Sequence, residues 1–188
     1  MHLRFFCQTD SSGSDKIAAA IRNESKRPMA LELTILVGTT NGIAQLVAQE
    51  IELRLESDDL KVATLPMDEL DARVFARCGL FLICTSTYGK GDVPDNAMNF
   101  YQSLQTVRPD LHHVRYGVFA LGDMVYAETF CNGGKRFDRL LAELGAKRIG
   151  EIALHDLSSG SLPEDEAAQW IEGWIALCRE QPGVSASI

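Results

Sequence analysis

Residues 31–55 read LELTILVGTTNGIAQLVAQEIELRL, and the fold prediction starts from this stretch. Its first part, Leu31–Val37, is a short and mainly apolar run, which is typical of a strand in a parallel sheet covered on both faces. Its last part repeats apolar residues every four positions, as the buried stripe of a helix does. These residues are Ile43, Val47, Ile51 and Leu55. The stretch therefore predicts a strand, a loop rich in glycine and threonine, and a helix.

The alternation of strand and helix continues along the rest of the chain. Further strands are predicted at Val62–Leu65, Leu80–Thr85, Tyr116–Leu121 and Arg148–Leu154. Helices are predicted around Phe100 and Leu104, and over Phe137–Leu144 with a left-handed cap at Gly145. The last helix is predicted to begin with a capping box, Ser161 to Glu164, and to bury Trp170 and Trp174. This alternation predicts an α/β fold with a doubly wound, five-stranded parallel sheet.

Composition indicates a folded, acidic protein of the size of one domain. The chain has 188 residues, of which 46% are hydrophobic, and its formal net charge is −8. A nucleic-acid binder is normally basic, so that class is excluded. No apolar run reaches the roughly 20 residues that a bilayer span requires, so no membrane segment is predicted. The amino terminus lacks the apolar core of a signal peptide, which argues against export.

The cysteines form neither a CxxC pair nor a cluster with metal-ligand spacing, and their odd number argues against a closed disulfide set. They are Cys7, Cys78, Cys84, Cys131 and Cys178. Reduced thiols predict a cytoplasmic protein. The pair His112 and His113 has no third ligand nearby in the sequence, so no metal site is predicted.

Residues 1–30 differ in character from the rest and are predicted to be a flexible amino-terminal appendage. Met29 stands directly before the first strand and is an alternative start of translation. Residues 31–180 are predicted to form the domain, and residues 181–188 a carboxyl-terminal tail.

Three loops follow predicted strands at their carboxyl ends, where open parallel sheets bind ligands. The first loop, Gly38–Ala44, presents backbone N–H groups and the positive end of a helix dipole to an anion, and Thr39 and Thr40 add hydroxyl donors. It predicts a phosphate cradle. It has neither a GxxxxGK[ST] nor a GxGxxG motif, so an NTPase and a dinucleotide-binding fold are not favoured. An ordinary helix cap explains the same residues equally well.

The second and third loops each carry a tyrosine. The second loop, residues 85–97, is long, and loops of this length in a compact domain are usually functional. Tyr88 lies there beside flexible glycines, and Tyr126 lies in the third loop, after Leu121-Gly122-Asp123. Two rings from neighbouring strand ends are able to sandwich one planar ligand. With the phosphate cradle, they predict a phosphorylated heteroaromatic ligand; the alternative for Tyr88 is a solvated turn with its ring folded onto the core.

Three segments carry a resemblance to a known family. Residues 85–101, TSTYGKGDVPDNAMNFY, are similar to the TYGxGDxPDNA loop of the short-chain flavodoxin-like FMN domains. Residues 120–126, ALGDMVY, and 130–149, FCNGGKRFDRLLAELGAKRI, resemble that family's LGxxxY segment and FCxxGKxxDxxLxxLGAxR helix. The likeness covers about Leu31–Leu177 and is greatest to the small MioC flavoproteins and to the FMN domains of diflavin reductases. It implies the flavodoxin-like strand order 2-1-3-4-5.

The resemblance also implies FMN as the cofactor and a set of residues that bind it. In the first loop the implied phosphate-binding residues are Thr39, Thr40, Asn41 and Gly42. Tyr88 and Tyr126 are implied to flank the flavin ring, with the backbone of Thr87, Gly89, Gly122 and Asp123 at the ring edge. The other implied cofactor-binding residues are Ile43, Lys90, Gly91, Leu121, Phe130 and Cys131. Asp156 falls near an acidic residue that the family has close to the flavin edge.

The implied function is that of an electron carrier. A separate NAD(P)H-dependent flavoprotein reductase is the implied donor, and an unidentified redox protein is the acceptor. No catalytic residue is predicted, because a bound flavin carries the chemistry itself. Two alternatives stay open: a stand-alone FMN-dependent NAD(P)H reductase, and a flavin-free interaction module. The second is favoured by Asn41 and Ile43, which depart from the family's usual phosphate loop.

Overall fold

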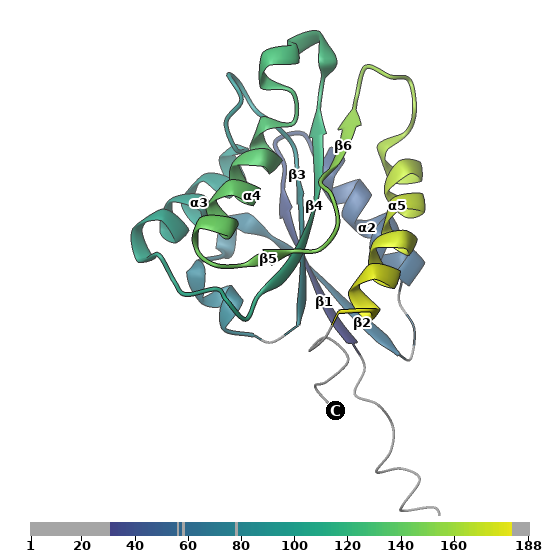
Figure 1. The fold of residues 1–188 in the computed structure, drawn as a ribbon. Coiled ribbons are helices and arrows are strands. Elements are labelled where there is room, and N and C mark those ends of the chain that lie inside the picture. The colour runs from purple at the N-terminus through teal and green to yellow at the C-terminus, as the bar shows by residue number, and fades with distance from the viewer. Residues whose placement is uncertain (1–30, 56, 58, 78, 182–188) are drawn as a thin grey trace, which may run out of the picture.

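The computed structural model describes residues 31–55, 57, 59–77 and 79–181, and these form one parallel sheet with helices on both faces (Figure 1). The strands are β1 (Leu31–Gly38), β2 (Leu60–Pro66), β3 (Leu80–Thr85), β4 (Arg115–Gly122), β5 (Lys147–Arg148) and β6 (Ala153–Asp156). They lie in the order β2-β1-β3-β4-β5, and β6 also pairs with β4. Every one of these pairings is parallel. The predicted α/β class and the strand order 2-1-3-4-5 are confirmed.

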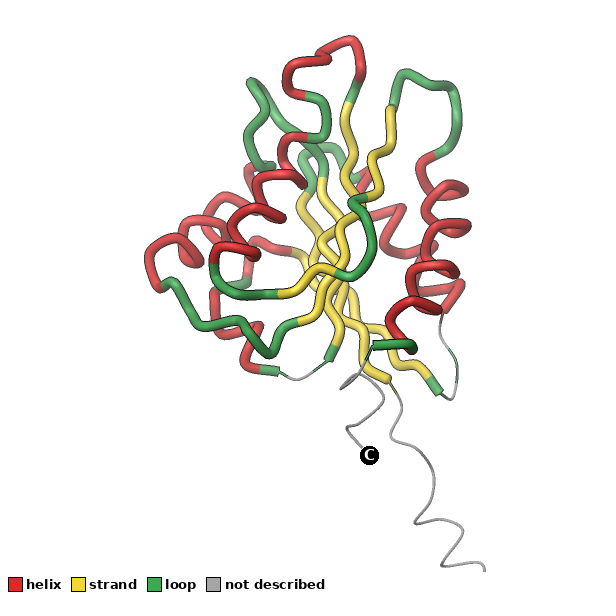
Figure 2. Tube along the Cα trace, viewed as in Figure 1, coloured by secondary structure: helices red, strands yellow, loops and turns green. Residues whose placement is uncertain are grey.

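Helices cover the two faces of the sheet in pairs. In the described residues the α-helices are α2 (Ile43–Leu55), α3 (Asp95–Val107), α4 (Asn132–Glu143) and α5 (Pro163–Arg179). Helices α3 and α4 lie on one face, and α2 and α5 lie on the other (Figure 2). Short 3₁₀ segments lie at Met67–Glu69, Ala72–Ala76 and Met124–Thr129. None of the described helices is both long and apolar enough to cross a membrane.

The predicted appendage, residues 1–30 with the alternative start Met29, lies outside the described residues, as do residues 182–188 of the predicted tail. The division of the chain into these parts therefore stays a prediction.

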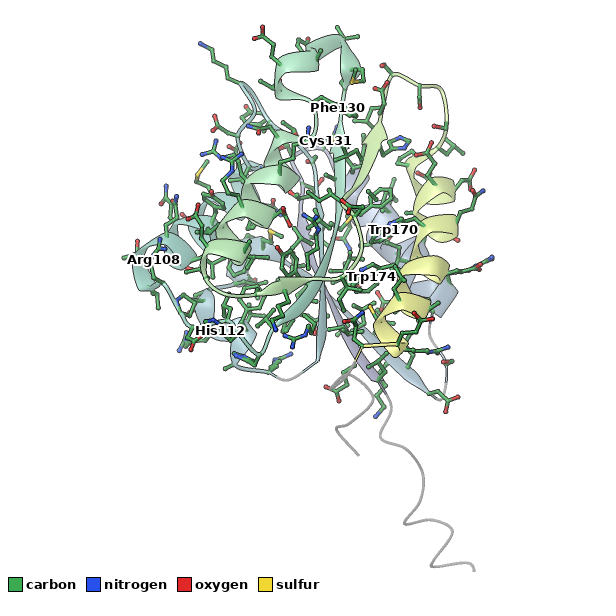
Figure 3. All side chains as sticks on the ribbon, viewed as in Figure 1. Arg108, His112, Phe130, Cys131, Trp170 and Trp174 are labelled. Carbon is green, nitrogen blue, oxygen red and sulfur yellow. The ribbon has the colours of Figure 1, made fainter. Side chains whose placement is uncertain are left out.

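The apolar residues of the strands form a core on each side of the sheet. On the α2 and α5 side, the Trp170 and Trp174 rings stack with their centroids 5.7 Å apart (Figure 3). Trp174 is buried, as predicted, and its indole N–H donates to the carbonyl of Ile149 at 2.9 Å. A Cβ on Gly117 of β4 would lie 2.5 Å from the Trp174 ring, so glycine is needed there. Trp170 is only partly buried and packs at the margin of this core.

Two local predictions were wrong. The strand predicted over Arg148–Leu154 is two strands, because Gly150 between them adopts a left-handed φ of 69° and breaks the pairing with β4. The capping box predicted for the last helix is absent, since Leu162 is the N-cap and makes no side-chain cap bond. Ser161 instead donates from its hydroxyl to Glu166 at 2.5 Å. Pro163 does lie in the first turn, where its missing N–H costs nothing.

The strand order creates a topological switch between β1 and β3. Helix α2 follows β1 onto one face, whereas α3 follows β3 onto the other. Gly38 at the end of β1 pairs with Thr85 at the end of β3, and the N–H of Ser86 donates to the Gly38 carbonyl at 3.0 Å. Open sheets of this kind bind ligands outside the carboxyl ends of the strands at such a switch. The fold therefore directs the search for a site to this edge of the sheet.

Candidate functional site

A cavity of about 500 Å³ lies at the carboxyl end of the sheet, between the loops that follow β1, β3 and β4. Its walls come from those three loops and from the residue after β6. The lining residues are Thr40, Asn41, Ile43, Ser86, Thr87, Tyr88, Gly89, Leu121, Gly122, Asp123, Tyr126, Thr129 and Leu157. The three segments that the sequence singled out thus converge on a single cavity.

The first loop is closed by side chains at the start of α2. Asn96 of α3 accepts from the N–H of Thr39 at 2.7 Å, and the Thr39 hydroxyl accepts from the N–H of Gly42 at 2.9 Å. Gly42 turns the chain into α2 with a φ of 86°, a conformation that glycine adopts without strain. Among the described residues, no acceptor bonds the backbone N–H groups of Thr40, Asn41 and Ala44. These groups, at the positive end of the α2 dipole, are available to an anion.

The second loop is a tight turn held by its own backbone. The N–H of Tyr88 donates to the carbonyl of Asp92 at 2.9 Å, and the N–H of Asp92 donates back to the carbonyl of Tyr88 at 2.8 Å. Gly89 and Gly91 have φ values of 54° and 91°, which the turn requires. Gly91 is buried, and its carbonyl accepts from the side chain of Asn132 at 2.7 Å. Lys90 lies exposed at the tip of the turn.

The hydroxyl of Thr87 joins the second loop to its neighbours. It donates to the carbonyl of Leu121 at 3.1 Å and accepts from the N–H of Gly133 at 3.1 Å. Asp92 in turn pairs with Arg136 of α4. Because these bonds come from β4 and from the first turns of α4, the second loop is fixed to the body of the fold. Tyr88 is nevertheless 46% exposed, so its ring faces the cavity rather than the core.

The third loop is a kinked 3₁₀ segment that carries Tyr126. Tyr126 has φ −107° and ψ 59°, which interrupts the helical turn, and its side chain is 68% exposed. The Asp123 carboxylate caps the segment by accepting from the N–H of Val125 at 2.8 Å. Asp156 at the end of β6 accepts from the N–H of Met124 at 3.0 Å. These hydrogen bonds lower the pKa of Asp156, so the carboxylate that holds the loop is ionised at neutral pH.

Phe130 and Cys131 lie under the third loop at this end of the sheet (Figure 3). A Cβ on Gly122 would collide with the backbone N of Cys131 and would lie 2.9 Å from the Phe130 ring. The Cys131 thiol donates to the carbonyl of Ala120 at 3.3 Å, and burial raises its pKa to about 12. This thiol is therefore neutral and packs as a small apolar group. The Lys135 ammonium lies 5.5 Å from the centre of the Phe130 ring.

The structure divides the predicted cofactor-binding residues into two groups. Those that line the cavity are Thr40, Asn41, Ile43, Thr87, Tyr88, Gly89, Leu121, Gly122, Asp123 and Tyr126. Those that are not part of its lining are Thr39, Gly42, Lys90, Gly91, Phe130 and Cys131. Except for exposed Lys90, the second group closes the loops or packs beneath them.

Sequence reasoning missed three lining residues, Ser86, Thr129 and Leu157. Ser86 belongs to the second loop, and its position directly after β3 was enough to predict that it lies at the site. Leu157 follows β6, whose separation from β5 was not foreseen. Asp156, which the resemblance places near the flavin edge, fixes the third loop with its side chain and is not among the residues that line the cavity.

The opposite end of the sheet has smaller cavities. One of about 430 Å³ lies beside Arg108 and His112, which Figure 3 shows far from Phe130 and Cys131. Within the described residues there is no group of three metal-binding side chains.

Comparison with known proteins finds a family model and several similar proteins. A family model described as flavodoxin matches residues 35–170. Flavodoxin YqcA of Escherichia coli is 41% identical over 146 residues, which cover 78% of this chain and 97% of that protein. MioC of Escherichia coli is 34% identical over 151 residues, which cover 79% of this chain and 99% of that protein.

Two further relatives extend the comparison. The sulfite reductase (NADPH) flavoprotein alpha-component of Bacillus subtilis is 37% identical over 172 residues, which cover 90% of this chain and 28% of that longer protein. The solved structure of a mutant flavodoxin from Pseudomonas aeruginosa superposes with a TM-score of 0.70 at 33% identity, covering 78% of this chain and 98% of that one. The chain therefore belongs to the flavodoxin family, whose members bind FMN and act in electron transport.

Proposed function

We propose that this protein binds one FMN in the cavity between its three loops and carries electrons from a separate reductase to a separate acceptor. The observation that supports this most strongly is the convergence of Tyr88, Tyr126 and the first loop on one cavity of about 500 Å³. When bound, FMN supplies reversible electron transfer, and the protein sets its affinity, orientation and potential.

The donors of the first loop suit a phosphate group. The free N–H groups of Thr40, Asn41 and Ala44 lie at the start of α2, where the helix dipole favours an anion. Thr40 and Asn41 also line the cavity with side chains that donate hydrogen bonds. No Lys or Arg lies among the lining residues, so in this proposal neutral donors hold the phosphate.

The two tyrosines suit a flat ring system. Both line the cavity and keep a large part of their surface exposed, which leaves their faces free to stack. Ile43, Leu121 and Leu157 add apolar walls. We infer that the ring lies between Tyr88 and Tyr126, with the backbone of Thr87, Gly89 and Gly122 at its edge.

The proposed donor is an NAD(P)H-dependent flavoprotein reductase, and the proposed acceptor is another redox protein. The net charge of −8 would speed the encounter with basic faces on such partners, because opposite charges steer association more than they add affinity. Cys84, Cys131 and Cys178 are buried free thiols, which suits a reducing compartment such as the cytoplasm.

The test is to purify the protein, remove any bound flavin, and titrate it with FMN, FAD and riboflavin. We expect one FMN per chain, with quenched flavin fluorescence, and much weaker binding of riboflavin because it lacks the phosphate. A protein that stays colourless and leaves FMN fluorescence unchanged would be the flavin-free interaction module instead. Oxidation of NADPH by the loaded protein without any partner would favour a stand-alone reductase.

A further inference from the structure

Asn96, in the first turn of α3, joins this helix to the end of β1. Its side-chain oxygen accepts from the N–H of Thr39 at 2.7 Å, and its side-chain nitrogen donates to the carbonyl of Val37 at 3.3 Å. These two backbone groups lie on either side of Gly38 in the chain, so one amide spans the point where β1 becomes the first loop. An asparagine amide suits this position because it offers a donor and an acceptor at once.

The packing around Gly38 brings α3 close enough for these bonds. A Cβ on Gly38 would lie 2.4 Å from the Thr85 hydroxyl and 3.3 Å from the Cβ of Ala97. Ala97 is fully buried, and its N–H donates to the carbonyl of Pro94 at 2.8 Å, which fixes the first turn of the helix. A closely packed part of the fold therefore presents Asn96 to the first loop.

Thr39 connects Asn96 to the start of α2. Its hydroxyl accepts from the N–H of Gly42 at 2.9 Å, so Thr39 is fixed both at its backbone and at its side chain. The carbonyl of Gly42 accepts from the N–H groups of Gln45 and Leu46, both at 3.1 Å, in the first turn of α2. A continuous series of hydrogen bonds thus runs from α3 through the first loop to α2.

This series determines which backbone N–H groups of the first loop stay available. The N–H groups of Thr39 and Gly42 have acceptors within the series, whereas those of Thr40 and Asn41 have none among the described residues. Thr40 and Asn41 are exposed and line the cavity, but Thr39 and Asn96 are not among its lining residues. Asn96 therefore acts on a ligand in the cavity only through the shape of the first loop.

We propose that Asn96 is a positioning residue for the phosphate group of FMN, because its two bonds hold the first loop with the N–H groups of Thr40 and Asn41 free. The inference rests on the proposed function. The loops that carry the two tyrosines are held by other bonds, which involve Asp92 and Asp156. Loss of the Asn96 amide therefore weakens binding of the phosphate and leaves binding of the ring nearly unchanged. Asn96 thereby raises the selectivity of the site for FMN over riboflavin, which lacks the phosphate.

The experiment measures the dissociation constants of FMN and of riboflavin for the apoprotein by fluorescence titration. In Asn96→Ala the N–H of Thr39 loses its acceptor, and we expect the FMN dissociation constant to rise about tenfold while that of riboflavin changes less than about twofold. Asn99→Ala removes an exposed amide from the next turn of the same helix and should bind both flavins as the wild type does. An equal loss of affinity for both flavins, or no loss for FMN, would overturn the proposal.

A double-variant cycle tests whether Asn96 acts through Thr39. Thr39→Val keeps the shape of the side chain but removes the hydroxyl that accepts from Gly42. Because both substitutions break the same series of bonds, we expect the double variant to bind FMN less than about threefold more weakly than the weaker single variant. A loss equal to the product of the two single effects would show that Asn96 acts by another route, and would contradict the proposal.

A measurement on the unaltered protein makes the test independent of whether Asn96→Ala folds. In the apoprotein we expect slow amide hydrogen exchange at Thr39, whose N–H is bonded to Asn96, and fast exchange at the exposed residues Thr40 and Asn41. FMN should slow the exchange at Thr40 and Asn41, and riboflavin should not. Exchange at Thr39 that is as fast as at Thr40 in the apoprotein would refute the role of Asn96.

The outcomes separate the two proposals. FMN bound as tightly by Asn96→Ala as by the wild type would refute the role of Asn96 and leave the proposed function intact. A wild-type protein that binds riboflavin as tightly as FMN would refute the phosphate site on which the inference depends, while a flavin site remains. A wild-type protein that binds neither flavin would refute both proposals.

Discussion

The second and third loops each bring one tyrosine to the same cavity, but they are held in different ways. The second loop is closed by backbone bonds between Tyr88 and Asp92 and is tied to α4 through Gly91 and Thr87. The third loop projects as a kinked 3₁₀ segment, and the bond that ties it to another strand comes from the Asp156 carboxylate. A loop fixed by backbone contacts offers a preorganised surface, whereas one held by a carboxylate can be released by protonation. This difference predicts unequal contributions of the two tyrosines to binding.

The largest effect is expected where α4 meets the second loop. A Cβ on Gly133 would collide with the backbone carbonyl of Ser86, which no rotamer change relieves. We expect Gly133→Ala to destabilise the protein by about 3 kcal/mol, because overpacking forces the backbone to move. Urea unfolding of the apoprotein measures this change. Gly173→Ala is the control, because Gly173 lies in α5 and an added Cβ would meet nothing within 4 Å. The free energy of unfolding of this variant should rise by about 0.5–1 kcal/mol.

The second prediction compares the two tyrosines directly. Loss of one aromatic face costs about 1–3 kcal/mol in other stacked complexes. We expect Tyr88→Ala to weaken FMN binding by about 2 kcal/mol and Tyr126→Ala by about 1 kcal/mol, because ordering the more exposed third loop offsets part of its contact energy. Fluorescence titration gives both values, and Tyr88→Phe, which keeps the ring, should bind nearly as wild type. Equal losses of FMN binding free energy in the two alanine variants would show that the two loops contribute equally to binding.

The third prediction concerns the carboxylate that holds the third loop. Hydrogen bonds from Met124 and Ser158 lower the pKa of Asp156 below its ordinary value of 3.8. The stabilisation is therefore present above that value and is lost as the pH falls through the lower pKa of the folded state. Amide exchange at Met124 should accelerate below about pH 4, while exchange at Tyr88 stays slow. In Asp156→Ala, which leaves no side-chain acceptor for the Met124 N–H, the fast exchange at Met124 should already be present at neutral pH.

A charge-matched control removes a carboxylate that does not hold the loop. Glu128 is exposed in the same segment, and Glu128→Gln should retain the pH dependence of the wild type. If Asp156→Ala also retains it, the proposed attachment of the third loop is wrong.

The smallest effect is expected at Lys90. This ammonium lies exposed at the tip of the second loop and would favour negative charge on a reduced flavin. We expect Lys90→Glu to lower the midpoint potential by less than about 59 mV, with the shift shrinking as salt is added. No change at low salt would show that Lys90 is too far from the flavin to matter, and a rise in potential would contradict the predicted electrostatic effect.

The strands, helices and loops were predictable because strong local patterns carry them, whereas the strand order was implied by the family resemblance. Apolar runs of strand length and the four-residue repeat from Ile43 to Leu55 locate β1 and α2, and the glycine-rich segment around Tyr88 marks a loop that must turn tightly. These features depend on residues close together in the chain. The two wrong predictions involve choices among competing partners: Gly150 breaks a strand that its neighbours would extend, and Ser161 bonds Glu166 rather than capping α5.

The roles of single residues at the site were harder to predict. Thr39 and Cys131 occur in motifs that also contain lining residues, yet they bond Gly42 and Ala120 instead. The bond of Asn96 to Thr39 gave no sequence signal, because it joins residues that lie 57 positions apart in the chain. Side-chain direction of this kind follows from tertiary packing, which spacing along the sequence does not encode.

The most direct test of the central claim is to map FMN binding by NMR on the labelled apoprotein. The account predicts that saturation with FMN shifts the backbone amides of Thr40, Asn41 and Ala44 most strongly, together with those around Tyr88 and Tyr126, and leaves Arg108 and His112 unchanged. Shifts confined to the cavity beside Arg108, or no shifts at saturating FMN, would contradict it.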